Sequence, residues 1–393
     1  MPTTSPELNP PEDPDALKTS QALVAALCRE AQSSTGGLPF ERFMEMALYA
    51  PGLGYYVAGT RKFGEGGDFV TAPEISPLFS RCLARQLAQV LAGVSGNAVL
   101  ELGAGSGVMA ADMLAELEVL GTLPDSYRIL EVSPELRQRQ ARTLDRRVPH
   151  LADRVAWLDA LPDRPLRGAV VANEVLDALP VQPFRLGPGA PEIQVLGCEA
   201  GRLSRHWMAA SEAHAAAIAE RVAASDPGPG YVSEYCPRLG PWVRTLGDVL
   251  EAGAVLLVDY GYPRAEYYHP GRDGGTLMCH YRHRAHADTL FLPGLQDITA
   301  HVDFTAVAEA GRHAGLEVAG FATQALFLMG CGIDGLVEEA AGRDEADFLK
   351  TVEGVKRLTL PTAMGERFKV MALTRDLPLP LMGFSLQDLR NRL

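Results

Sequence analysis

The stretch of sequence that decides the fold is VLELGAGSG, residues 99–107. A short apolar segment, 98–102, enters a turn with glycine at 103, 105 and 107, and a helical pattern follows from about 108 to 120. In open α/β sheets, a strand that leads through a glycine-rich turn into a helix is the usual place for a nucleotide-like ligand. A dinucleotide-binding turn has the spacing GxGxxG, whereas the spacing here is Glu-x-Gly-x-Gly-x-Gly, with Glu101 closing the strand.

This form of the turn resembles the first motif of class I S-adenosylmethionine methyltransferases. The resemblance implies that Glu101, Gly103, Gly105 and Gly107 belong to the cofactor site, where the glycines let the backbone approach the amino-acid part and the ribose of the ligand. Two alternatives stay open at this point. One is a nicotinamide-type ligand, and the other is a turn that only joins a strand to a helix.

Acidic residues also end the next two predicted strands. Glu131 closes the second strand, where a carboxylate can accept hydrogen bonds from both ribose hydroxyls. Asp159 follows the third strand, where a methyltransferase would present a polar group to the amino nitrogen of adenine. The alternative for Asp159 is a loop residue or a helix cap. Three elements in this order predict S-adenosyl-L-methionine as the cofactor.

Strands and helices alternate around the glycine-rich turn. This alternation predicts an α/β fold with a parallel, doubly wound sheet. The fold class that we expect is a class I methyltransferase (Rossmann-like) seven-stranded sheet with an N-terminal helical segment and large insertions after strands four and five. The predicted strands are 98–102, 127–132, 155–158, 168–172, 254–259, 316–321 and 367–374.

We expect one catalytic core that is interrupted by insertions. The insertion 183–253 contains a predicted hairpin, 193–207, and an alanine-rich helix, 211–224. The predicted parts are a disordered leader (1–16), an N-terminal helical and loop segment covering the cofactor site (17–95), the first half of the core (96–182), an inserted substrate-side subdomain (183–253) and the second half of the core with loop and helical insertions (254–393).

Composition narrows the function classes. The chain has 393 residues, 47% hydrophobic and 22% charged, which is typical of a soluble globular protein. Its formal net charge of −13 argues against a protein that mainly grips the phosphates of nucleic acids. No apolar run reaches the roughly 20 residues that a membrane span needs.

The cysteines and the leader predict a cytoplasmic bacterial protein. The 6 cysteines are scattered without any CxxC pair, so we expect reduced, mostly buried thiols. Residues 1–16 are rich in proline and acidic residues and contain no lysine or arginine, unlike a signal or transit peptide.

Longer stretches identify a narrower family. The chain reads GDFVTAPEIS at 67–76 and NEVLDALPV at 173–181, with shorter matches at 39–49, 52–56, 259–261 and 299–304. These stretches resemble the MidA-type methyltransferases, which include the mitochondrial complex I assembly factor 7 group. The resemblance implies methylation of a protein, with arginine as the acceptor in the mitochondrial members. Those members carry a mitochondrial targeting segment, and the absence of one at residues 1–16 fits a bacterial relative.

The same resemblance places the N-terminal loop at the cofactor. It implies cofactor contacts for Phe69, Thr71, Pro73 and Glu74, with Glu74 and Asp68 covering the cofactor like a lid. The alternative for Asp68 and Glu74 is hydrogen bonding within the loop itself, as in an Asx-turn.

Methyl transfer from a sulfonium is a displacement reaction in which most of the gain comes from positioning the acceptor. An arginine acceptor arrives charged, and a pair of carboxylates can hold its planar guanidinium. We predict catalytic roles for Glu174, which follows the fourth strand, for Asp177 one turn later, and for Glu234 in the insertion. The alternatives are a turn-stabilising role for Asp177 and a surface ion pair for Glu234.

Asn173 is predicted to contact the cofactor. The sequence Asn-Glu-Val-Leu at 173–176 differs from the N/D-P-P-Y/F motif of enzymes that methylate nucleic-acid bases, so we expect no nucleic-acid partner. The partner expected instead is a protein that carries the acceptor arginine. A small-molecule acceptor, in an enclosed apolar pocket, and a non-catalytic assembly factor that binds the cofactor are the alternatives.

One further cluster invites a metal interpretation. Cys279, His280, His283 and His286 are closely spaced, but zinc requires three or four ligands that converge on one point. Arginines at 272, 282 and 284 oppose a cation, so we expect no metal. His301 could take part in proton removal, or it could be a helix cap or core residue.

Overall fold

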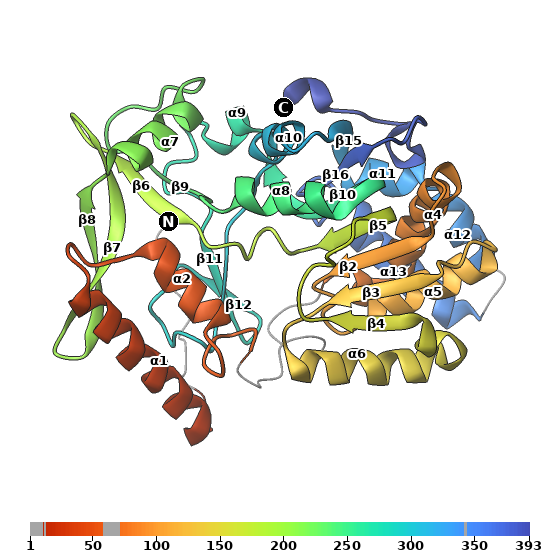
Figure 1. Cartoon of the computed structure of the whole chain (residues 1–393), viewed down its shortest axis with the longest axis horizontal. Coiled ribbons are helices and arrows are strands. Elements are labelled where there is room, and N and C mark those ends of the chain that lie inside the picture. Colours follow the sequence, from red (N-terminus) through yellow and green to blue (C-terminus); the bar gives the residue numbers. More distant parts are fainter. Residues whose placement is uncertain (1–10, 12, 58–70, 342–343) are drawn as a thin grey trace. The chain divides into compact units, whose positions relative to one another are not determined.

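The computed structural model describes residues 11, 13–57, 71–341 and 344–393 (Figure 1). The chain divides into two compact units, which are described separately. Unit 1 is drawn from Met1–Phe69, Leu176–Leu239 and Tyr262–Asp303. Unit 2 is drawn from Val70–Val175, Gly240–Gly261 and Phe304–Leu393. Most of the expected leader lies outside the described residues, and so do Asp68 and Phe69.

Unit 2 contains the expected α/β sheet. The strands are hydrogen-bonded in the order β15-β16-β10-β5-β2-β3-β4. From β10 to β4 all neighbouring strands are parallel, and β16 runs antiparallel to both of its neighbours. The strands are β2 (Ala98–Leu102), β3 (Ser126–Leu130), β4 (Val155–Leu158), β5 (Leu166–Asn173), β10 (Leu250–Tyr262), β15 (Glu317–Thr323) and β16 (Phe368–Arg375).

The central strands of this sheet are almost wholly buried. Ala169 to Ala172 in β5 and Ala254 to Val258 in β10 have no exposed surface, which is the burial expected of a parallel sheet covered on both faces. Two short helices, η1 (Pro149–Arg154) and η2 (Met382–Phe384), and a C-terminal turn, η3 (Arg390–Arg392), accompany the α-helices. The α-helices are α3 (Ala72–Ile75), α4 (Pro77–Gly93), α5 (Val108–Val119), α6 (Pro134–Arg147), α8 (Leu239–Val249), α10 (Phe304–His313), α11 (Gln324–Gly330), α12 (Ile333–Ala341) and α13 (Glu345–Thr359).

Local signals explain where the helices of unit 2 begin. Ser133 accepts a hydrogen bond from the Leu136 backbone N–H, and Pro134 occupies the first turn of α6. Ser76 caps α4 in the same way, with Pro77 after it. A capping side chain followed by proline is a strong helix-start signal because it satisfies or removes free N–H donors.

Unit 1 is built around an antiparallel sheet in the order β1-β7-β6-β9, with β8 paired to β7. A smaller sheet, in the order β12-β11-β13, belongs to the same unit. Helix α1 packs on β7 and β8, and α2 packs on β6 and β7. The elements are α1 (Pro14–Ser33), β1 (Leu38–Pro39), α2 (Phe40–Tyr49), β6 (Gln182–Leu186), β7 (Pro191–Glu199), β8 (Arg202–Ala209), α7 (Glu212–Val222), β9 (Val232–Tyr235), α9 (Arg264–Tyr267), β11 (Met278–Tyr281), β12 (Arg284–His286), β13 (Asp297–Thr299) and β14 (Val302–Asp303).

Several details differ from the sequence-based expectations. Helix α1 begins at Pro14, inside the expected leader, because the Asp13 carboxylate accepts a hydrogen bond from the Asp15 N–H and caps the helix. Strand β6 and the sheet β12-β11-β13 were not predicted. The units also cut across the expected parts, since α4 packs with α5 in unit 2 whereas Tyr262–Asp303 belongs to unit 1.

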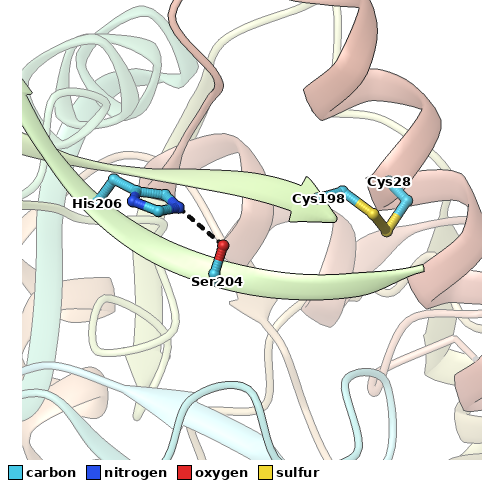
Figure 2. Close-up of a disulfide and its surroundings, with 4 residues drawn as sticks. All are labelled: Cys28, Cys198, Ser204 and His206. Carbon is cyan, nitrogen blue, oxygen red and sulfur yellow. Dashed lines mark hydrogen bonds between the residues drawn. A yellow bond between two sulfur atoms is a disulfide. The ribbon is translucent and has the colours of Figure 1, made fainter. Parts of the chain in front are cut away.

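The expectation of reduced thiols is wrong for two of the six cysteines. Cys28 of α1 and Cys198 of β7 form a disulfide, with their Cα atoms 5.1 Å apart (Figure 2). Their sequence separation of 170 residues explains why no local motif announced the pair. In the same view, Ser204 and His206 are hydrogen-bonded to each other on β8.

The other cysteines, Cys82, Cys236, Cys279 and Cys331, are free thiols. Burial raises the pKa of Cys82 and Cys236 to about 12, which makes these two thiols poor nucleophiles at neutral pH. Within the described ranges, none of the helices combines the length and the apolar character needed to cross a membrane.

Candidate functional site

The predicted cofactor residues of unit 2 gather at the carboxyl ends of the parallel strands. Backbone hydrogen bonds join these ends in register, so that the residues after β2, β3, β4 and β5 lie along one edge of the sheet. This edge is where open α/β sheets bind their ligands. The bonds run from the N–H of Gly103 to the carbonyl of Leu130 (3.3 Å), from Glu131 to Leu158 (3.3 Å) and from Glu174 to Val258 (2.9 Å).

The glycine-rich turn needs glycine at all three predicted positions. Gly103, Gly105 and Gly107 have φ of +65°, +52° and +79°, a region that other residues adopt only with strain. A Cβ at Gly107 would lie 2.9 Å from the Cα of Gln140 in α6, and one at Gly103 would lie 3.1 Å from Val175. A side chain at Gly103 or Gly107 would therefore crowd the neighbouring segments.

Glu101 lies beneath this turn with no exposed surface. Its Oε2 accepts a hydrogen bond of 2.6 Å from the Tyr127 hydroxyl, whereas Oε1 is buried without a hydrogen-bond partner among the described residues. Burial raises the pKa of Glu101 to about 7, partly offset by the bond from Tyr127. An unsatisfied buried carboxyl oxygen is consistent with a donor supplied by a ligand.

Glu131 is oriented by hydrogen bonds to both of its oxygens. Oε1 accepts the Ser133 backbone N–H at 2.9 Å, and Oε2 accepts the side-chain amide of Gln140 at 3.0 Å. The side chain is buried, and burial raises its pKa. A carboxylate has about four lone-pair positions, so both oxygens can also accept a ribose hydroxyl.

Gln140 was not predicted from the sequence. It lies in α6 without exposed surface, and its Nε2 donates to the Gly105 carbonyl at 3.2 Å as well as to Glu131. Its Oε1 accepts the indole N–H of Trp157 at 2.8 Å. Helix α6 is rich in charged residues, so only the position of Gln140 on the helix could have indicated that it is buried.

Asp159 lies after β4, and its side chain is 93% exposed. Arg137 makes an ion pair of 2.7 Å with it and donates to the carbonyls of Glu131 and Leu158, which holds the ends of β3 and β4 together. The predicted contact of Asp159 with adenine stays a prediction. Val132, which follows Glu131, is 61% exposed and offers an apolar surface that suits the face of a flat base.

Three of the predicted N-terminal contacts can be placed. Thr71 precedes the short helix α3, and Pro73 is buried within it. The Oε1 of Glu74 lies 4.0 Å from a guanidinium nitrogen of Arg139, whereas its Oε2 is buried without a hydrogen-bond partner in the part of the chain that the structure describes. Phe69, the fourth predicted contact, lies outside the described residues.

Asn173 and Glu174 form the most unusual local geometry of the site. Glu174 has φ of +52°, which is rare for a non-glycine residue and is typical of functional positions. The side-chain N–H of Asn173 donates to Oε1 of Glu174 at 3.1 Å. The opposite orientation of the amide would place Oδ1 of Asn173 against Oε1 of Glu174, so Oδ1 must point away from Glu174. This oxygen is buried and has no hydrogen-bond partner among the residues described.

The other two predicted catalytic residues belong to unit 1. Asp177 is buried, its carbonyl accepts the Ala300 N–H at 3.0 Å, and its charge helps burial to raise the pKa of Tyr49 and Tyr56. The Tyr56 hydroxyl donates to both carboxylate oxygens of Asp297 at 3.1 Å. The turn-stabilising alternative for Asp177 stays open.

Glu234 is a buried carboxylate, so the alternative of a surface ion pair is wrong. Its oxygens accept the Tyr267 hydroxyl at 2.7 Å and the hydroxyl and backbone N–H of Thr276 at 2.6 and 3.0 Å. A Cβ at Gly275 would lie 2.0 Å from its Oε2. These contacts hold the 275–276 segment, and a direct part in methyl transfer stays a prediction.

The histidine cluster lies on a hairpin of unit 1. In the register of β11 and β12, Cys279 faces His286 and His280 faces Ala285, so the side chains alternate between two faces. Over the described ranges, the structure brings together no group of three or more residues able to hold a metal ion. His301 packs its ring against Tyr262, and its backbone N–H donates to the Thr276 hydroxyl.

Comparison with known proteins identifies what this geometry is similar to. Residues 82–322 match the model of a family described as S-adenosyl-L-methionine-dependent methyltransferase. The mitochondrial protein arginine methyltransferase NDUFAF7 of Mus musculus is 33% identical over 86% of this chain and 81% of its own length. Its homolog in Drosophila melanogaster is 28% identical over 98% of this chain and 94% of its own length.

Solved structures agree with the sequence comparisons. A Burkholderia thailandensis protein bound to S-adenosyl-homocysteine is 44% identical, covers 98% of this chain and 100% of its own, and superposes with a TM-score of 0.93. A native crystal structure of a protein of the same superfamily, from the same organism, gives a TM-score of 0.90 at 43% identity, over 98% of this chain and 100% of its own. The expectations of an α/β methyltransferase fold, of this family and of its cofactor are confirmed.

Proposed function

Because this chain belongs to the family of S-adenosyl-L-methionine-dependent methyltransferases, we propose that its methyl acceptor is an arginine side chain of a partner protein. Two observations support the proposal. The mammalian and insect relatives named above are protein arginine methyltransferases. The end of β5 also presents Glu174 in a strained backbone conformation, as a functional carboxylate would be.

The residues present fit the cofactor. Gly103, Gly105 and Gly107 would let the ligand approach the backbone closely. Glu131, oriented by Ser133, would accept the ribose hydroxyls, and the buried Oε1 of Glu101 has no hydrogen-bond donor among the described residues. The exposed side chain of Val132 suits the base. When bound, the cofactor supplies an electrophilic methyl group on a sulfonium.

Glu174 is the residue on which the acceptor chemistry depends. A guanidinium is charged at neutral pH, and a carboxylate can hold its planar N–H groups in a fixed orientation. The hydrogen bond from Asn173 orients the Glu174 carboxylate. The Oδ1 of Asn173 has no hydrogen-bond partner among the described residues, so it can accept an N–H of the substrate guanidinium. After transfer, Glu174 accepts the proton that the alkylated nitrogen gives up. In this proposal, most of the rate enhancement comes from positioning the guanidinium nitrogen against the methyl group of the cofactor.

A labelled methyl-transfer assay on lysate proteins, followed by mass spectrometry of the labelled band, tests the proposal. Glu174→Gln should bind S-adenosyl-homocysteine as the wild type does but lose methylation of arginine, since the neutral amide cannot hold the cation or take the proton. The control is Glu251→Gln, which alters an exposed carboxylate paired with Arg167 and should leave methylation unchanged.

Each outcome has a distinct meaning. Label on arginine that is lost in Glu174→Gln supports the proposal. Label on lysine or on a small molecule contradicts the arginine acceptor, and cofactor binding without turnover on any protein fraction supports a non-catalytic assembly factor. The family resemblance makes a subunit of respiratory complex I the first partner to test, and a bacterial cytoplasmic location stays a prediction.

A further inference from the structure

Gln140 is a fully buried glutamine on a helix whose other residues are mostly charged. Its side-chain amide has partners in three separate segments: the glycine-rich turn, the end of β3 and strand β4. Burying an amide is costly unless its hydrogen-bonding groups are satisfied, and here each of them is engaged. This degree of satisfaction indicates an architectural purpose at the cofactor edge of the sheet.

The partners determine which way the amide points. The Trp157 indole can only donate, so the group that it contacts at 2.8 Å must be the amide oxygen of Gln140. The amide nitrogen then faces the other way, where it donates to the Gly105 carbonyl at 3.2 Å and to Oε2 of Glu131 at 3.0 Å. One side chain therefore ties the turn to the carboxylate.

We propose that Gln140 is a positioning residue for the cofactor: it sets the spacing between the glycine-rich turn and the Glu131 carboxylate, which contact different parts of the same ligand. The proposal rests on the assignment of this turn and of Glu131 to the cofactor site. Gly107 reinforces the arrangement, because its Cα packs so close to Gln140 that a Cβ there would lie 2.9 Å from the Gln140 Cα. The hydrogen bond from Trp157 fixes the orientation of the Gln140 amide.

The amide also favours the ionised form of Glu131. Burial favours the neutral carboxyl and raises its pKa, whereas the hydrogen bonds from Ser133 and Gln140 and the charge of Arg137 act in the opposite direction. Glu101, the nearby acidic group, interacts unfavourably with the Glu131 charge. Without the Gln140 donor the pKa of Glu131 rises further, so the carboxylate needed for the ribose hydroxyls is lost at a higher pH.

The test is calorimetric binding of S-adenosyl-homocysteine to the full chain with Gln140→Met, a variant of similar length that lacks the amide. We expect affinity about tenfold to hundredfold weaker at neutral pH, since two hydrogen bonds, one of them to a carboxylate, are removed. The midpoint of the pH dependence of binding should also move to higher pH. The matched control is Gln324→Met, which removes another buried amide of unit 2, bonded to the Leu358 carbonyl, and should leave both readouts unchanged.

Wild-type affinity in Gln140→Met would overturn the proposal, and so would a uniform loss with an unchanged pH midpoint, which indicates a packing defect alone. Should circular dichroism show that this variant does not fold, Trp157→Phe decides the question. Loss of the indole donor frees the amide and should weaken binding about threefold, whereas unchanged binding refutes the role of Gln140. The probe is the cofactor product alone, so the result is independent of which acceptor is methylated.

Discussion

Replacing Gly107 with alanine perturbs the glycine-rich turn by one methyl group, and its two costs can be separated. The φ of +79° disfavours any residue with a Cβ by about 1–2 kcal/mol. The new Cβ would also lie 2.9 Å from the Gln140 Cα, against about 3.4 Å for an ordinary contact, so the turn or α6 must shift by about 0.5 Å (3.4 − 2.9). Overpacking of this kind costs about 1–3 kcal/mol.

Gly121→Ala is the matched control for Gly107→Ala. Gly121 has φ of +66°, and a Cβ there would meet no atom of the described residues within 4 Å. It therefore carries the backbone strain without the collision and should lose about 1–2 kcal/mol of unfolding free energy. Gly107→Ala should lose about 2–5 kcal/mol in total, the sum of the two costs.

Chemical denaturation measures the unfolding free energy, and calorimetry measures S-adenosyl-homocysteine affinity. A shift of α6 moves the Gln140 amide relative to Gly105, so Gly107→Ala should bind the ligand about tenfold more weakly while Gly121→Ala binds normally. Equal loss of stability in the two variants, together with unchanged affinity in Gly107→Ala, would refute the idea that the contact of the turn with α6 limits binding.

Three further predictions concern stability. Cys28→Ala, like reduction of the wild type, should lower the melting temperature, because the cross-link to Cys198 closes a loop of 170 residues. The expected loss in free energy of unfolding is about 2–5 kcal/mol. A melting temperature that does not change when reductant is added would contradict this prediction. Glu116→Gln should lower the free energy of unfolding by about 2 kcal/mol, because it removes the charge that accepts hydrogen bonds from two arginines of α4 at 2.5 and 3.1 Å. Wild-type stability that does not respond to salt would argue against the pairing. Burial raises the pKa of Glu101 from 4.5 to about 7, so between these pH values the folded cofactor-free protein keeps a proton that the unfolded chain has lost. The free energy of unfolding should therefore fall by up to about 3 kcal/mol as pH rises from about 4.5 to 7. Glu101→Gln should flatten this decline, and an unchanged slope would contradict the burial effect.

The ligand-binding edge of the sheet could be predicted because its signals are local. Strand β2 ends at Leu102, and the three glycines follow at once, each in the left-handed conformation that the pattern requires. Glu131 follows the short strand β3, and Asn173 ends the largely apolar strand β5. Residues that close neighbouring parallel strands must meet at one edge, so order along the chain predicts proximity in space.

The parts that escaped prediction depend on neighbours far away in sequence. Glu234 was predicted to be catalytic, with a surface ion pair as the alternative, and only the folded structure shows that Tyr267 and Thr276 enclose it in unit 1. Strand β6 has too short and mixed a sequence to be recognised without β7 and β9, which pair with it on either side. The strained φ of Glu174 is visible only in the folded backbone.

The sequence alone determined the α/β class and the glycine-rich turn, because hydrophobic periodicity and glycine spacing act over a few residues. The cofactor followed from the resemblance of that turn to the first motif of class I S-adenosylmethionine methyltransferases. Tertiary structure decided how that turn is held. Gln140 lies in a helix rich in arginine, where the sequence suggests that a polar side chain is solvated. In the folded protein it is buried and bonded to Gly105, Glu131 and Trp157. The physical reason is that a hydrogen bond between segments is specified by all of its partners together, and no single segment records it.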